Sequence, residues 1–432
     1  MVRPVLAVLI FLLTLYLVIA KPRNLNDGLA ALLGAGLALL TGVIGLADIL
    51  TVAHLVWDAT FALIAIVIVS TVLDGAGFFR WAALQMARRA GGSGRAIFVA
   101  IILLGALVST LFTNDATVLI LTPIVYELLV ALGFSPRQML PYLVACGFVA
   151  DAMSIPLAVS NLTNMIAVRQ FGLEFARYAL LMLLPALATL AATLLVLRLY
   201  YRRELPAGYD RGALPTPSSA IRDPFLFRVG AGVLVLMVLA FFLNSLWHFP
   251  VSFVIAAGAI VLLLATQKNR VVEPVAVLKG APWHVILFAS GMFLVVFGLA
   301  ASGLTNLLAG WVTAMATSHH GALVIGTGSL VAVLSAGLNN LPAVMVGGLA
   351  IQAGNLSAPL REAAVLANVI GADIGPKLTP IGSLATLIWL YFLGKKGIKI
   401  SWREYFKVGL VITPPVLLAA LLGLWGALTL LG

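Results

Sequence analysis

The sequence has 432 residues, of which 62% are apolar and only 9% are charged, and its formal net charge is +11. Soluble domains carry about a quarter charged residues, so this composition excludes an ordinary soluble protein. The Lys and Arg residues are scattered through short polar stretches, which argues against a nucleic-acid partner. The single cysteine, Cys146, excludes a disulfide framework and a multi-cysteine metal cage within the chain.

Apolar runs recur from end to end, each long enough to cross a hydrocarbon core of about 30 Å. The first, Val5 to Ala20, follows Arg3 and has no small-x-small cleavage pattern before Lys21, so we expect a helix of the mature protein rather than a signal peptide. The chain is therefore predicted to be an all-α, multi-pass integral membrane protein surrounded by lipid.

The largest polar stretch lies near the middle of the chain, at Tyr200 to Arg228. It divides the sequence into a first half (1–199), a cytoplasmic linker (200–228) and a second half (229–432). The halves resemble each other in the spacing of their polar residues and glycines. The corresponding positions are Trp57 and Trp283, Gly77 and Gly303, Asn114 and Asn339, Asp151 and Asp373, and Asn161 and Ser383.

Two polar tips, Thr113-Asn114-Asp115 and Leu338-Asn339-Asn340, each lie between apolar runs that are too closely spaced for two full crossings with a loop. We therefore expect re-entrant hairpins at Ala96 to Phe134 and Gly321 to Ala353, where polar backbone is tolerated because it lines a cavity. Each half then makes five crossings, which predicts about ten transmembrane helices and an inverted repeat, an architecture typical of secondary transporters.

The distribution of positive charge agrees with this topology. Nearly all Lys and Arg residues outside the apolar runs fall on one predicted side, which should be cytoplasmic, and only Arg3, Arg169, Arg177 and Arg361 fall on the other. With ten spans and two hairpins, both termini lie outside.

Ionisable residues within apolar segments are costly and are functional candidates by default. At the first tip, Asp115 lies beside Asn114 and Thr117, where it binds a cation, a proton or a polar solute, or else only caps the helix. Asn339 and Asn340 supply amides without charge at the second tip, so we expect one titrating tip rather than two.

Two predicted helix breaks follow the remaining aspartates. After Asp151, Pro156 and the polar run Ser160 to Asn164 interrupt a helix and free its ends for a ligand. Asp373 and Lys377 are four residues apart on the counterpart segment, so they are predicted to pair if that segment is helical. Such a pair either lowers the cost of membrane insertion or is broken by a proton or substrate to trigger transport.

Candidate residues thus fall into two groups. The predicted substrate-binding residues are Asn114, Thr117, Asn161, Thr163, Asn164, Asn339, Asn340 and Ser383. The predicted proton-coupling residues are Asp115, Asp151, Asp373 and Lys377. No G-x-x-x-x-G-K-[ST] motif is present, and we expect no cofactor, metal site or catalytic group.

Several of these motifs resemble one transporter family over nearly the whole chain. They include Leu111-Phe112-Thr113-Asn114-Asp115, Asn339-Asn340-Leu341-Pro342 and Gly375-Pro376-Lys377-Leu378-Thr379-Pro380-Ile381-Gly382-Ser383. Together they resemble the arsenite/antimonite efflux pumps, the ArsB family of the ion transporter superfamily.

The resemblance implies a bacterial inner-membrane carrier that exports trivalent arsenic or antimony as the neutral hydroxide. It implies that proton influx drives export. In some systems of the family, a cytosolic ATPase subunit that docks on the carrier powers export instead. The cysteine count is compatible with this, because three thiolates would hold trivalent arsenic too tightly for turnover and only Cys146 is present.

Three rival functions remain at this point. A sodium-coupled carboxylate carrier of the same superfamily would use an unpaired Lys377 for its anion, and a sodium/proton antiporter needs only the aspartates. An intramembrane hydrolase would need paired aspartates or a Ser/His arrangement, but Asp151 and Asp373 lie in opposite halves without a catalytic motif.

Overall fold

Helices form almost the entire chain in the computed structural model, which describes residues 2–247, 249–268, 271–300 and 303–431. The first half and the linker contain α1 (Val2–Ala20), η1 (Pro22–Asn24), α2 (Asp27–Leu40), α3 (Leu46–Gly75), α4 (Phe78–Arg89), α5 (Gly94–Leu111), α6 (Asn114–Ala131), α7 (Pro136–Ala152), η2 (Ala158–Ser160), α8 (Leu162–Phe171), α9 (Phe175–Tyr201), η3 (Arg211–Ala213) and η4 (Pro217–Ala220). The second half contains α10 (Pro224–Trp247), α11 (Val251–Thr266), α12 (Pro274–Gly280), α13 (His284–Ala300), α14 (Leu304–Ser318), α15 (His320–Leu338), α16 (Asn340–Ala353), α17 (Ala358–Ile374), η5 (Gly375–Leu378), α18 (Leu384–Lys395) and α19 (Trp402–Leu431).

Nine helices in the described ranges are long and apolar enough to cross a membrane: α1, α3, α5, α6, α9, α10, α15 and α19, together with the segment from α12 through α13. Four further apolar helices are shorter, namely α2, α11, α16 and α18. The chain is thus an all-helical membrane protein. These nine are not the ten predicted crossings, because they include α5, α6 and α15, which were predicted to form re-entrant hairpins, whereas α2 and α11 are shorter than 18 residues.

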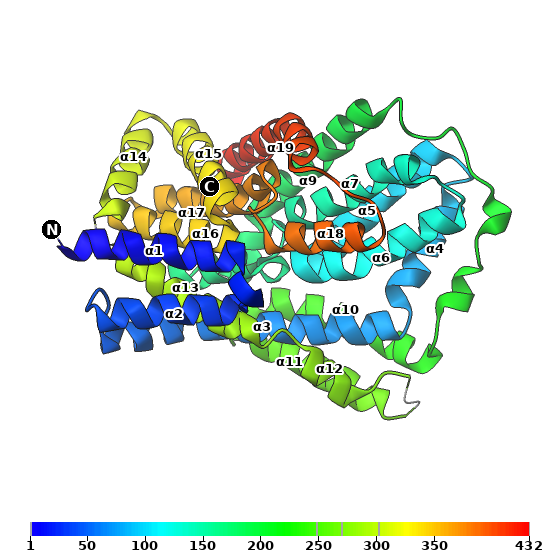
Figure 1. Cartoon of the computed structure of the whole chain (residues 1–432), viewed down its shortest axis with the longest axis horizontal. Helices are drawn as coiled ribbons and strands as arrows, with labels where there is room; N and C mark the ends of the chain where they lie inside the picture. The colour runs from blue at the N-terminus through cyan, green and yellow to red at the C-terminus, as the bar shows by residue number, and fades with distance from the viewer. Residues whose placement is uncertain (1, 248, 269–270, 301–302, 432) are drawn as a thin grey trace.

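The two sequence halves interlock rather than forming separate bodies. The closest helix pairs in the molecule include α9 with α19, α2 with α13, and α3 with α11, and each of these pairs joins the first half to the second. Large apolar side chains remain exposed along the outer helices, as expected where lipid is the solvent. Figure 1 shows the N-terminus and α14 at one end of the molecule and the linker between α9 and α10 at the other.

The glycines that matched in sequence also match in conformation. Gly77 and Gly303 both adopt left-handed backbone, with φ of 88° and 83°, and each is the N-cap of the short helix that follows, α4 or α14. Only glycine adopts such φ values without steric cost. A Cβ on Gly77 would also lie 1.8 Å from the Ala220 carbonyl oxygen in the linker, so the linker packs directly on this turn.

The helices break where the sequence predicts. Between α7 and α8 the chain leaves the α-helix from Met153 to Asn161, and between α17 and α18 it passes through η5 and an irregular stretch to Ser383. The predicted hairpins are the pairs α5–α6 and α15–α16, joined at Phe112-Thr113 and at Asn339. Breaks and hairpin tips converge on the interior of the molecule, where they bring the polar residues together.

Candidate functional site

The first hairpin tip holds a side chain against the first broken helix. Thr113 is the N-cap of α6, and its Oγ1 accepts a hydrogen bond from Ala116 N (3.4 Å). This turn directs Asn114 inward, where its Nδ2 donates to Asp151 Oδ1 at 2.7 Å. Asn114 and Asp151 are both buried, so the contact ties the hairpin to the end of α7 in the interior of the protein.

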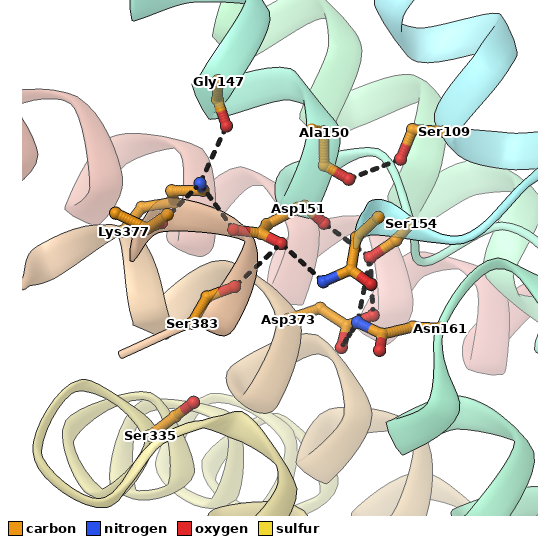
Figure 2. Close-up of polar contacts among 12 residues, drawn as sticks. Ser109, Gly147, Ala150, Asp151, Ser154, Asn161, Ser335, Asp373, Lys377 and Ser383 are labelled. Atoms are coloured by element: carbon orange, nitrogen blue, oxygen red, sulfur yellow. Dashed lines mark hydrogen bonds and ion pairs between the residues drawn. The ribbon is translucent and has the colours of Figure 1, made fainter. Parts of the chain in front are cut away.

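Asp151 belongs to the first half, yet the second half supplies most of its partners. Lys377 Nζ lies 2.5 Å from Asp151 Oδ2 and Ser383 Oγ donates to Oδ1 at 3.2 Å, as Figure 2 shows. The carboxylate thus receives two neutral donors, from Asn114 and Ser383, and one cation. An ionised carboxylate is well satisfied by such a set.

Lys377 does not pair with Asp373, so the prediction made from their four-residue spacing is wrong. Gly375 and Pro376 convert the end of α17 into the 3-10 helix η5, which changes the angle between the two side chains. Lys377 instead donates to the Gly147 carbonyl oxygen (2.7 Å) and to Thr386 Oγ1 (3.0 Å) in addition to its contact with Asp151. Its side chain is only 3% exposed.

Asp373 receives only uncharged donors. Asn161 Nδ2 and Thr163 Oγ1 donate to Oδ1 at 2.9 and 2.8 Å, and Ser154 Oγ lies 3.1 Å from Oδ2. Ser154 and Asn161 lie in the break between α7 and α8, and Thr163 lies in the first turn of α8, so all three partners come from the first half. In the described part of the chain, no Lys, Arg or His forms an ion pair with Asp373, which is fully buried.

The two aspartates therefore exchange partners between the halves. Asn161 of the first half contacts Asp373 of the second, and Ser383 of the second half contacts Asp151 of the first. These were matched positions in the sequence repeat. The exchange places both broken helices around one buried polar centre, which we call the aspartate centre: Asp151, Asp373 and Lys377 with the side chains that contact them (Figure 2).

The hairpins contact the broken helices in a matching way. Ser109 Oγ of α5 donates to the Ala150 carbonyl oxygen at 2.5 Å, and Ser335 Oγ of α15 donates to the Ala372 carbonyl oxygen at 3.0 Å. Each acceptor immediately precedes an aspartate. When Ser109 is aligned with Ser335, the counterpart of Asn114 is Asn340. The alignment made from the sequence had paired Asn114 with Asn339, one residue earlier.

The second tip is built differently from the first. Asn339 adopts φ of 78°, and its Nδ2 donates to the Ile381 carbonyl oxygen at 3.4 Å. Asn340 N donates to the Gly382 carbonyl oxygen at 3.0 Å, and Asn340 Oδ1 accepts from Leu341 N at 2.9 Å. Both asparagines thus contact backbone near Ser383, and no hydrogen bond joins either to Asp373.

Of the remaining predicted residues, Asn164 interacts with the Asp373 carboxylate through its side chain, whereas Thr117 and Asp115 form no hydrogen bond to either carboxylate among the described residues. Thr117 Oγ1 donates to its own helix at Thr113 O (2.9 Å), and Asn164 Nδ2 donates to Ser154 O (2.7 Å). Asp115 is half-buried at the start of α6, and within the described ranges no hydrogen bond or ion pair holds its side chain.

Sequence reasoning missed four residues that position the centre: Ser109, Ser335, Gly147 and Thr386. The two serines precede Asn114 and Asn340 by the same number of residues, so a repeat alignment extended into the apolar helices would have found them. Gly147 and Thr386 carry no such signal, because their role depends on where Lys377 points. No group of three or more His, Cys, Asp or Glu suited to a metal occurs among the described residues.

Comparisons with known proteins agree with this architecture. The family model described as arsenical pump membrane protein (ArsB) matches residues 6–428. The chain is 47% identical to the arsenical pump membrane protein of Escherichia coli K12 (97% of this chain, 98% of that protein) and 48% identical to that of Yersinia enterocolitica (96% and 97%). It is 30% identical to a putative arsenical pump membrane protein of Bacillus subtilis (96% and 97%).

A solved structure shares the fold. The YdaH transporter of Alcanivorax borkumensis, described as having an unusual topology, superposes with a TM-score of 0.53 over 87% of each chain at 15% identity. At that identity the likeness concerns the fold alone. With the family match across nearly the whole sequence, the chain belongs to the ArsB family of arsenical pump membrane proteins and is a membrane transporter rather than an enzyme.

Proposed function

We propose that this protein exports trivalent arsenic and antimony, as their neutral hydroxides, from the cytoplasm in exchange for protons. Relatives that are 46–48% identical over nearly their whole length are named arsenical pump membrane proteins, which supports the substrate. The observation that carries the mechanism is the exchange of partners between Asp151 and Asp373, because it connects two buried carboxylates to both halves of the carrier.

The two aspartates have different roles in this proposal. Asp151 stays ionised, since Lys377 neutralises it at 2.5 Å and Asn114 and Ser383 donate to it. Asp373 takes up and releases the proton, since it is fully buried and no cation of the described residues pairs with it. An isolated carboxylate in such surroundings is costly as an anion and is readily neutralised by a proton.

The hydrogen bonds of Ser154 support a protonated Asp373. A serine hydroxyl has one hydrogen to donate, and Ser154 Oγ lies 2.6 Å from the Asp151 carbonyl oxygen and 3.1 Å from Asp373 Oδ2. If the hydrogen goes to the closer carbonyl, the contact with Asp373 is a hydrogen bond only when Asp373 itself donates. A proton on Oδ2 satisfies both contacts.

Coupling then follows from competition at Asp373. A neutral trihydroxide carries three O–H donors, which stabilise an ionised carboxylate as a proton does. Asn161 and Thr163 already donate to this carboxylate and are positioned to bind a hydroxide oxygen. Proton and substrate are therefore alternative occupants of one site. A carrier that exchanges a proton entering the cell for a substrate leaving it requires such a site.

The membrane arrangement that we propose is an inverted repeat in a bacterial inner membrane. It has ten crossings, two re-entrant hairpins (α5–α6 and α15–α16), halves at 1–199 and 229–432, and a cytoplasmic linker at 200–228. The matched contacts of Ser109 and Ser335 and the matched glycines Gly77 and Gly303 support the repeat. The concentration of Lys and Arg on the linker side supports the orientation.

The state of Lys377 argues against a carboxylate carrier. That rival required a free ammonium to bind an anion, but Lys377 is buried and already paired with Asp151. A sodium/proton antiporter would release protons on addition of sodium alone, which separates it experimentally from an arsenite exchanger.

Arsenite accumulation in inverted membrane vesicles tests the proposal. The purified chain is reconstituted without ATP, an acidic lumen is imposed, and uptake of arsenite or antimonite is measured with and without a protonophore. We expect uptake that collapses with the protonophore. No uptake with an active control carrier would contradict self-sufficient proton exchange. Restoration by a cytosolic arsenite-stimulated ATPase with ATP would assign the energy source to that partner.

A further inference from the structure

The first turn of α9 contacts both of the elements that meet at Asp373. Tyr178 OH donates to the Ile155 carbonyl oxygen at 2.9 Å, in the break between α7 and α8 that supplies donors to Asp373. The neighbouring Arg177 forms an ion pair with Glu362 of α17, the helix that carries Asp373. One turn of helix therefore connects the donors to the helix of the carboxylate that receives them.

The contact of Tyr178 fixes backbone that no helix supports. Ile155 lies in the irregular part of the break, between Pro156 and Ser154, and Ser154 contacts Asp373. A buried carbonyl needs a hydrogen-bond donor, which the phenol supplies here. Tyr178 and Ile155 are both fully buried, so water does not compete for this bond. The phenol is also close enough to Asp373 to interact with it electrostatically.

The ion pair fixes the other side of the same contact. Arg177 Nε and Nη2 donate to the two carboxylate oxygens of Glu362, each at 2.7 Å. Because the Arg177 side chain is 46% exposed, the pair adds little stability, but its bidentate geometry sets an orientation. Glu362 precedes Asp373 by about three helical turns, so the two lie on the same side of α17. The pair therefore holds the rotation of α17 that directs Asp373 to the break.

The second half has no equivalent turn. Tyr405 is the fourth residue of α19, as Tyr178 is of α9, yet its OH lies beside a side chain of α18 rather than a backbone carbonyl. Glu404 occupies the position of Arg177 and forms no ion pair in the described part of the chain. The aspartate of the first half is held by Lys377 instead.

We propose that the first turn of α9 positions Asp373 for proton exchange. Tyr178 holds the break that carries the donors, and Arg177, through Glu362, holds the helix that carries the carboxylate. We call these three side chains the α9 brace. This inference rests on the proposed function, and it adds positioning residues that contact neither the proton nor the substrate. The brace matters because neutral donors stabilise an ionised carboxylate only when they are aimed at it.

Few other ionisable groups surround Asp373. Besides the phenol of α9, the aspartate centre contains Asp151 of α7 and Lys377 of η5, which pair with each other. The phenol of α19 lies beside Lys377. Of the other helices packed on α17, α8 and α15 carry Arg169 and His320 near the ends remote from the centre, and α16 carries no ionisable side chain. The pH dependence of transport thus reports how well the donors stabilise Asp373.

Equilibrium exchange of arsenite tests the brace. The purified chain is placed in liposomes with the same pH and arsenite concentration on both faces, and labelled arsenite exchange is followed over a range of pH. In the proposed mechanism arsenite binds the ionised Asp373, so exchange rises through a midpoint as the pH rises. Tyr178→Phe weakens the donors of the ionised form, and we expect it to move the midpoint up by about 0.5 to 1 pH unit.

Tyr142→Phe is the matched control. Tyr142 is also fully buried, and its OH also donates to a backbone carbonyl oxygen at 2.9 Å, that of Gly94 at the start of α5. Both variants should lower the free energy of unfolding by similar amounts. Only Tyr178→Phe should move the midpoint, and Tyr142→Phe should keep it within about 0.2 pH unit of the wild-type value.

The ion pair provides a second measurement that does not depend on Tyr178. Arg177→Gln and Glu362→Gln should each move the midpoint upward, and the exchanged pair Arg177→Glu/Glu362→Arg should bring it at least halfway back. A direct effect of charge on Asp373 would instead move the midpoint in opposite directions in the two single variants. Glu127→Gln, which breaks the exposed Arg80–Glu127 pair between α4 and α6, should leave it unchanged.

The outcomes separate the brace from the proposed function. Wild-type exchange with a pH midpoint that neither Tyr178→Phe nor the ion-pair variants move would overturn the brace alone. Equal shifts in Tyr178→Phe and Tyr142→Phe, or opposite shifts in Arg177→Gln and Glu362→Gln, would also overturn it. Wild-type protein that exchanges no arsenite, or exchanges it independently of pH, would overturn the proposed function itself.

Discussion

Asp151 and Asp373 occupy corresponding positions in the two halves, but their surroundings differ. Asp151 contacts a lysine and two neutral donors, whereas Asp373 contacts, among the described residues, only neutral donors from the break between α7 and α8 and from the first turn of α8. The difference comes from one residue, Lys377, which has no cationic counterpart after Asp151 in the first half. Corresponding positions of the sequence repeat thus carry one carboxylate with a cationic partner and one with neutral partners.

The difference matters for the proposed mechanism. Two identical carboxylates would compete for one proton and resist being ionised together. In the proposal, Lys377 neutralises one of them and leaves Asp373 to exchange the proton. The strongest tests therefore change the partner that distinguishes the two sites.

Lys377→Met should have the largest effect. It leaves Asp151 buried without its cation, which typically costs about 3–5 kcal/mol. We expect a corresponding loss of unfolding free energy in mixed detergent and SDS micelles, together with loss of transport. The double variant Lys377→Met/Asp151→Asn should recover most of the stability but not transport. A stable single variant would show that Asp151 is not held as an anion by Lys377.

The matched pair Asp151→Asn and Asp373→Asn compares the two carboxylates directly. Asp151→Asn strands the Lys377 charge and should destabilise the fold by about 3–5 kcal/mol. Asp373→Asn resembles the protonated acid, since its amide can donate to Ser154, so its stability should change by less than about 1 kcal/mol. Asp373→Asn should keep arsenite counterflow yet lose accumulation driven by a pH gradient. Equal loss of stability in the two variants would contradict the assigned difference.

The hairpin contacts offer a comparison in which the halves should behave alike. Ser109→Ala and Ser335→Ala each remove a buried hydrogen bond to the carbonyl that precedes an aspartate. We expect both variants to lose about 1 kcal/mol of unfolding free energy. Unequal values, measured in the same micelles, would mean that the repeat is matched in geometry but not in energy.

Asp115→Asn should have the smallest effect on stability, within about 0.5 kcal/mol, because no hydrogen bond or ion pair among the described residues holds its side chain. We expect proton-driven uptake to persist at a reduced rate, because the proposed mechanism assigns the proton to Asp373 rather than to Asp115. Loss of the pH-gradient response with counterflow intact would instead place Asp115 on the proton path.

Much of the site was predictable from the sequence. The cost of placing Asp151, Asp373 and Lys377 in apolar segments marked them as candidates, and the Pro and Gly residues beside them predicted the breaks. The repeat paired Asn161 with Ser383, and each proved to contact the aspartate of the opposite half. The error in pairing Lys377 with Asp373 arose because α-helical spacing was assumed through η5.

The sequence by itself determined that this chain is an all-helical membrane protein, that its helices break at two polar segments, and which family it belongs to. These properties depend on composition, local backbone preference and motifs, all of which are read along the chain. Only the tertiary structure decided which carboxylate receives the lysine, and that Gly147 and Thr386 hold the lysine beside it. Those contacts join residues far apart in sequence, and they depend on how interlocked helices pack rather than on spacing within any one helix.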